Sequence, residues 1–147
     1  MKKILFTILV CLVSVVSFGQ LNLNTESRKA VASNSFGDGI YQFTDGVYLS
    51  LEFWEDNGLN KKFHPSVGYK YIKLGDDLSQ ATTSLNQLMD LMDSKSNDIL
   101  TIYTRDEEEL SINRDVQGGL EFRFNSQNLP YYSVIYKFRI KSLLKKL

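Results

Sequence analysis

The chain has 147 residues, and its 17 lysine and arginine residues balance 17 aspartate and glutamate residues. This balance gives no electrostatic reason to expect a nucleic acid as partner. His64 is the only histidine and Cys11 the only cysteine. A metal site built from several histidines and a disulfide-linked fold are therefore excluded, and no metal or other cofactor is expected.

The first nineteen residues have the layout of a bacterial secretory signal peptide. Two lysines precede an apolar run over residues 4–18, and small residues stand at positions 17 and 19, before Gln20. The run has 15 residues, fewer than the ~20 that cross a bilayer, which favours a cleaved signal over a membrane anchor. Cys11 lies inside the run, which disfavours a lipoprotein. We therefore expect an exported protein, periplasmic or extracellular, with no transmembrane span after removal of residues 1–19.

Residues 20–38 are polar, and we expect a flexible leader with at most a weak helical turn at 28–32. A hairpin is predicted next, because apolar runs at 40–43 and 47–49 flank Asp45-Gly46, and glycine supplies the positive φ of a tight turn.

Residues 50–58 fit two patterns. Alternating apolar residues would prolong the preceding strand, whereas Ser50 as an N-cap and Gly58 after a helix end would fit one or two helical turns. We favour a strand that ends at Leu49, then helical turns. A further strand is predicted at 66–74.

The clearest element is an amphipathic helix at residues 77–93. Six apolar residues fall within an arc of roughly 100° when each residue turns by 100°. They are Leu78, Ala81, Leu85, Leu88, Met89 and Met92. Asp76 or Asp77 can cap the start. Such a helix is expected to pack against a sheet.

Four β segments are predicted after the helix, at 99–104, 109–113, 119–125 and 131–141. Leu120, Phe122 and Phe124 alternate with polar residues, as do Tyr132 and Val134. Clean alternation and short connections are typical of antiparallel strands. The sequence thus predicts one α+β domain over residues 39–147, a mainly antiparallel sheet of about six strands with one amphipathic helix packed on it.

No catalytic constellation is recognised. His64 stands in a polar segment before a proline, and no Gly-x-Ser-x-Gly elbow accompanies it. Aromatic residues are concentrated between positions 41 and 71. Most are expected in the core, but exposed aromatic faces bind sugar rings or peptide side chains. The residues chosen as a possible binding platform are Tyr48, Trp54, Tyr69 and Tyr71.

Two stretches resemble a known group of proteins. Residues 45–57 contain Gly46-x-Tyr48-x-Ser50, followed by acidic and aromatic residues up to Asn57, and the second stretch covers 115–141. With the leader that ends in Ser-Phe-Gly, they resemble uncharacterised exported proteins of Bacteroidota. The resemblance implies export and brings no known activity.

We therefore expect a non-enzymatic binding or envelope-associated module whose partner is a protein or a glycan. A small periplasmic hydrolase that uses carboxylates and an accessory subunit of an envelope complex are the alternatives. A contiguous exposed aromatic face would favour binding, and two facing carboxylates in a concave pocket would favour the hydrolase.

Overall fold

The structure is a computed structural model that describes residues 27–56, 65–95, 99–125 and 130–147. Its elements in chain order are β1 (Lys29–Ser33), β2 (Gly39–Phe43), β3 (Gly46–Glu55), β4 (Ser66–Gly75), α2 (Leu78–Asp93), β5 (Leu100–Tyr103), β6 (Glu109–Arg114), β7 (Leu120–Asn125), β8 (Pro130–Ile135) and α3 (Lys137–Leu144). The α+β class and the antiparallel sheet are confirmed. The described ranges hold eight strands and two helices, more than the predicted six and one.

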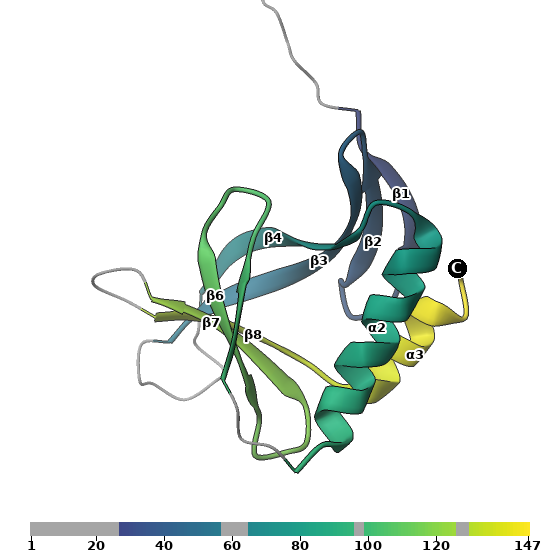
Figure 1. Cartoon of the computed structure of the whole chain (residues 1–147). Helices are drawn as coiled ribbons and strands as arrows, with labels where there is room; N and C mark the ends of the chain where they lie inside the picture. The colour runs from purple at the N-terminus through teal and green to yellow at the C-terminus, as the bar shows by residue number, and fades with distance from the viewer. Residues whose placement is uncertain (1–26, 57–64, 96–98, 126–129) are drawn as a thin grey trace, which may run out of the picture.

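All the described strands belong to one sheet with the order β1-β2-β3-β8-β7-β6-β5, and β4 pairs with the other edge of β3. The first half of β3 pairs with β2 and its end with β8, while β4 runs along its opposite edge. The sheet curls (Figure 1) until an isolated bridge joins Ile72 of β4 to Thr104, just after β5. The predicted hairpin is present, and Gly46 has a φ of 143°.

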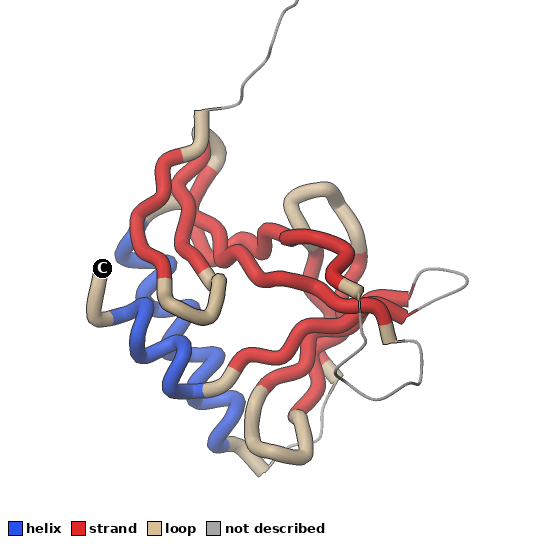
Figure 2. Tube along the Cα trace, turned by 180° about the vertical axis from the view of Figure 1, so that it is seen from behind, coloured by secondary structure: helices blue, strands red, loops and turns tan. Residues whose placement is uncertain are grey.

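The helices α2 and α3 lie side by side along the sheet (Figure 2). The helix predicted at 77–93 is confirmed, and its N-cap Asp77 accepts a hydrogen bond from the backbone N–H of Gln80 at 2.8 Å. Ala81, Leu85 and Met92 of α2 are buried in the same core cluster as residues of both halves of the sheet. Neither helix of the described ranges has the length and apolar character needed to cross a bilayer.

The prediction of helical turns after Leu49 is wrong, because β3 continues to Glu55. Leu51 and Phe53 are fully buried, and alternation puts both on the core face with Leu49. Ser50, the predicted N-cap, is instead a strand residue on the opposite face. Burial of two large side chains outweighs a capping preference worth about 1 kcal/mol.

The predicted strand at 131–141 is correct only as far as Ile135, where β8 ends and α3 follows. Ile140 and Leu143, three residues apart on one face of α3, are fully buried beside α2. The side chains of β8 that point into the core also differ from the prediction. Ile135 and Ser133 are buried and pair with Leu120 and Phe122, whereas Tyr132 and Val134 are partly exposed.

The sheet begins inside the segment 20–38 that was expected to be a flexible leader. β1 pairs with β2 where a weak helical turn was predicted, and its Ala32 is buried. Asp38 is only 1% exposed and forms an ion pair with Arg139 of α3. Backbone pairing and this ion pair order a sequence that has few apolar side chains. The predicted signal peptide at 1–19 and His64 lie outside the described residues.

Candidate ligand-binding site

The outer face of β2, β3 and β4 carries most of the aromatic residues in this part of the chain. Successive side chains of a strand point to opposite faces, so β3 sends Leu49 and Leu51 into the core and Tyr48 and Ser50 outward. The pairing of Tyr48 with Tyr41, and of Ser50 with Tyr71, places tyrosines of three strands on this outer face.

A recess of about 520 Å³ lies on this face, and we call it the tyrosine recess. It is lined by Arg28, Gly37, Tyr41, Ser50, Tyr69 and Tyr71. Two of the four residues chosen from the sequence, Tyr69 and Tyr71, are therefore brought together in one concave site. Tyr69 is 48% exposed and presents most of the accessible aromatic surface.

Edge-to-face ring contacts hold the tyrosines in place. The ring centroid of Tyr71 lies 5.7 Å from that of Tyr41 and 5.2 Å from that of Phe43. The guanidinium of Arg28 lies 5.5 Å from the ring centroid of Tyr41 and 5.9 Å from that of Tyr71, and it donates a hydrogen bond to the Tyr71 hydroxyl. Such contacts favour one ring orientation, so the wall of the recess is preformed.

Two glycines give the recess its opening. Gly37 has a φ of 88°, and a Cβ there would lie 3.2 Å from the hydroxyl of Tyr69. At Gly39, a Cβ would lie 2.6 Å from a ring carbon of Tyr41. A side chain at either position would push against a tyrosine that lines the recess.

Ser50 lies at the base of the recess and is 2% exposed. A serine hydroxyl can both donate and accept a hydrogen bond. The side chain is therefore placed to bond a molecule that enters the recess.

Tyr48 supports the recess from beside it. Its ring is buried against Phe43, with centroids 5.2 Å apart, and its hydroxyl donates a hydrogen bond to Asp45 at 2.8 Å. Burial and this hydrogen bond raise the pKa of the Tyr48 hydroxyl. Burial alone would raise the pKa of Asp45, but the bond from Tyr48 and the nearby Arg105 lower it.

Trp54, the fourth residue chosen from the sequence, lies outside the recess. It stands four residues beyond Ser50 on β3, about 13 Å along the strand. There it pairs with Tyr132, over whose ring the guanidinium of Arg123 lies at 5.5 Å. Arg123 also binds Asp56 at 2.8 Å and Glu121 at 2.9 Å, so this second cluster is a compact ion-pair network.

Within the described ranges, no group of three or more His, Cys, Asp or Glu side chains is arranged to hold a metal ion. No family model, curated protein or solved structure matches the chain.

Sequence reasoning missed Arg28 and Ser50 as site residues. Arg28 falls in the segment interpreted as a leader, and Ser50 was assigned to a helix cap. The usable signal was the alternation of β3, which puts Ser50 in phase with Tyr48 and so on the outer face.

Proposed function

We propose that the protein is an exported, non-enzymatic binding module, and that the tyrosine recess binds a glycan that carries an acidic group. Export rests on the layout of residues 1–19, with two lysines, an apolar run and small residues before Gln20. The binding role rests on the outer face of β2, β3 and β4.

The observation that carries the glycan proposal is the recess itself, in which Ser50 lies beside three tyrosines. A sugar presents hydroxyl groups that can both donate to and accept from this serine. Its apolar ring faces stack on tyrosine, and Tyr69 offers an exposed ring at the rim of the recess. Arg28, which is charged and lines the recess, favours an anionic ligand.

The character of the recess lining supports binding over hydrolysis. The described residues that line it are neutral or basic, whereas glycoside hydrolysis uses a pair of carboxyl groups that flank the scissile bond. The ligand proposed for this site is therefore held and released unchanged.

The test is an array of acidic and neutral oligosaccharides, followed by calorimetric titration of those that bind. We expect Tyr69→Ala to weaken binding of an acidic oligosaccharide roughly three- to tenfold, because one stacked aromatic contact is lost. Tyr103→Ala is the matched control, since Tyr103 is exposed on β5, away from the recess. It should bind as the wild-type protein does.

Ser50→Ala separates ligand binding from folding. The substitution removes a single oxygen atom from a small side chain, so we expect it to change the free energy of unfolding by about 1 kcal/mol or less. The same variant should bind the oligosaccharide more weakly. The glycan proposal fails if no oligosaccharide on the array binds, or if Tyr69→Ala and Ser50→Ala both bind with wild-type affinity.

Export is tested separately, by mass spectrometry of the N-terminus after expression in a bacterium. A chain that still starts at Met1 would refute the proposal of export.

A further inference from the structure

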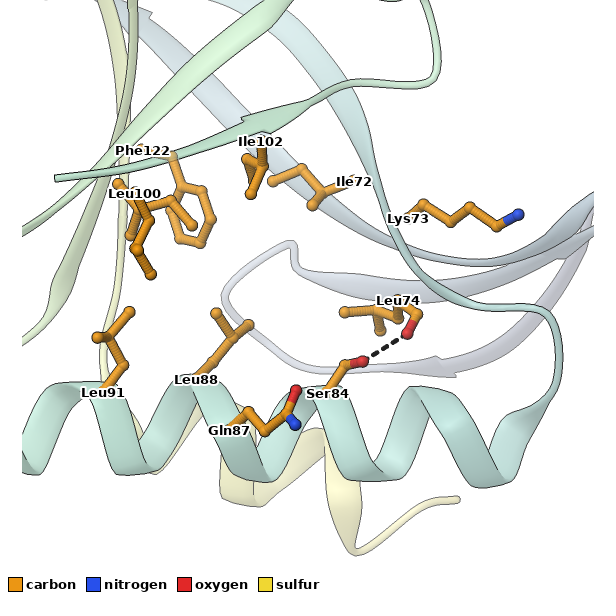
Figure 3. A pocket seen from close by; sticks show the side chains of 11 residues that line it. Ile72, Lys73, Leu74, Ser84, Gln87, Leu88, Leu91, Leu100, Ile102 and Phe122 are labelled. Carbon is orange, nitrogen blue, oxygen red and sulfur yellow. Dashed lines mark hydrogen bonds between the residues drawn. The ribbon is translucent and has the colours of Figure 1, made fainter.

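A second cavity lies on the other face of β4, between α2 and the sheet. It has a volume of about 270 Å³, and we call it the α2 cavity. Its lining residues are Ile72, Lys73, Leu74, Ser84, Gln87, Leu88, Leu91, Leu100, Ile102, Ile112 and Phe122. Figure 3 shows Leu88 and Leu91 pointing from α2 toward Phe122, Ile102 and Ile72 of the sheet.

The interior of the α2 cavity is hydrocarbon. Ser84 is polar, but its hydroxyl donates a hydrogen bond to the backbone oxygen of Leu74 at 2.5 Å. The side chain of Lys73 points away from the cavity (Figure 3), and its ammonium group binds Asp76 at 2.7 Å. Gln87 is exposed on α2 and lies at the rim. A polar group placed inside would lose its hydration without gaining a partner, so the cavity selects an apolar ligand.

The shape of the α2 cavity selects a chain. Its helix residues Ser84, Gln87, Leu88 and Leu91 follow the spacing i, i+3, i+4 and i+7 on one face. These positions span about 10 Å along the helix axis. Dividing the cavity volume by this length gives the cavity a mean cross-section of roughly 26 Å². That width suits one extended hydrocarbon chain and is narrow for a fused ring system. An apolar cavity of ~150 Å³ binds benzene, and on that scale 270 Å³ holds about ten carbon atoms.

The cavity has an opening beside β5. Within the described ranges, β4 and β5 come together near Thr104, where the bridge to Ile72 lies. Toward the start of β5, Leu100 lines the cavity and is 41% exposed, and the preceding Ile99 is 68% exposed. Leu100 therefore gives the cavity an apolar mouth through which a chain can enter.

We propose that the α2 cavity binds the acyl chain of one medium-chain fatty acid, with its carboxyl head in water at the mouth beside Leu100. This site is separate from the tyrosine recess, because Ile72 and Leu74 point to the opposite face of β4 from Tyr69 and Tyr71. The two proposals therefore stand or fall independently.

The test is calorimetric titration of the purified full chain with laurate as the probe. The wild-type protein should bind one laurate per chain. Leu88→Phe fills the cavity and should weaken probe binding about tenfold or more. Leu78→Phe is the matched control, since Leu78 is exposed on the same helix outside the cavity. It should bind the probe as the wild-type protein does, and so should Tyr69→Ala.

If Leu88→Phe fails to fold by circular dichroism, Leu100→Trp at the mouth replaces it, with the same expected loss of binding. Equal probe affinity in the wild type and in a folded blocking variant would overturn the proposal. So would loss of probe binding in Tyr69→Ala, which would place the acyl chain in the tyrosine recess. A second copy of the chain as occupant would appear as a dimer that Leu88→Phe dissociates and that laurate leaves unchanged. That result would also overturn it.

Discussion

The ion pair between Asp38 and Arg139 is expected to be the strongest polar contribution to stability. The guanidinium Nε of Arg139 donates to Asp38 at 2.6 Å, a second nitrogen also binds this carboxylate, and a third donates to the backbone oxygen of Val134 at 2.9 Å. Asn34 gives Asp38 one more hydrogen bond at 2.8 Å. Together these contacts fix α3 to the turn between β1 and β2.

Arg139→Met removes the charge and keeps much of the apolar stem. Breaking a buried ion pair costs about 3–5 kcal/mol, and the remaining Asn34 bond favours the lower end of that range. The lost bond to Val134 adds about 1 kcal/mol. We therefore expect Arg139→Met to lower the free energy of unfolding by about 4 kcal/mol, a large part of the 5–15 kcal/mol typical of a domain.

The assay is equilibrium unfolding in urea, followed by circular dichroism. Asp38→Asn combined with Arg139→Met removes the uncompensated carboxylate and should regain part of the loss, so the two substitutions should not be additive. Lys137→Met is the control, because it breaks only the partly exposed pair with Asp93 and should cost less than about 1 kcal/mol. A loss below 1 kcal/mol in Arg139→Met, or a double variant less stable than Arg139→Met, would refute the reasoning.

Three further predictions concern the core, pH and the first hairpin. Leu85→Ala empties a fully buried site on α2 and should lower the free energy of unfolding by about 2–5 kcal/mol in the same urea assay. The lowered pKa of Asp45 means that its charged form stabilises the fold above its ordinary pKa of 3.8. This contribution is lost as pH falls through the lower folded value, so Asp45→Asn should show a flatter stability profile below pH 3.8, and an unchanged profile would contradict this. Gly46→Ala needs a φ near 143° and places a Cβ 2.6 Å from the backbone oxygen of Gly75, so the melting temperature should fall by several degrees.

The elements that could be predicted from the sequence are those whose signals are local. The helix α2 has both a 3.6-residue apolar period and a capping aspartate, and the hairpin of β2 and β3 has Asp45-Gly46 at its turn. In the C-terminal region the alternation of apolar and polar residues continues from Tyr132 to Ile140, so it does not mark the change from β8 to α3 after Ile135. The helix α3 is stabilised instead by Ile140 and Leu143, which pack in the core beside α2. This contact joins distant parts of the chain.

Only those residues of the candidate site that have a local sequence signal could be predicted. Tyr69 and Tyr71 follow from a tyrosine-rich strand, and the recess does contain them. Tyr48 is in phase with them but is covered by Phe43 and bonded to Asp45. Arg28 reaches the site only because β1 joins the sheet, and a strand of five residues is too short for a clear apolar pattern.

One edge of β3 pairs with β2 in its first half and with β8 at its end, so the sheet can be completed only when β8 is present. Trp54 and Glu55 pair with Tyr132 and Tyr131, so the end of β3 stays unpaired on that side until β8 has been synthesised. Contacts of such long sequence separation form slowly, typically in milliseconds to seconds. Any version of the chain that lacks β8 would expose the end of β3 as a template for aggregation. A chain still under synthesis therefore carries the same exposed edge until its β8 residues have been added.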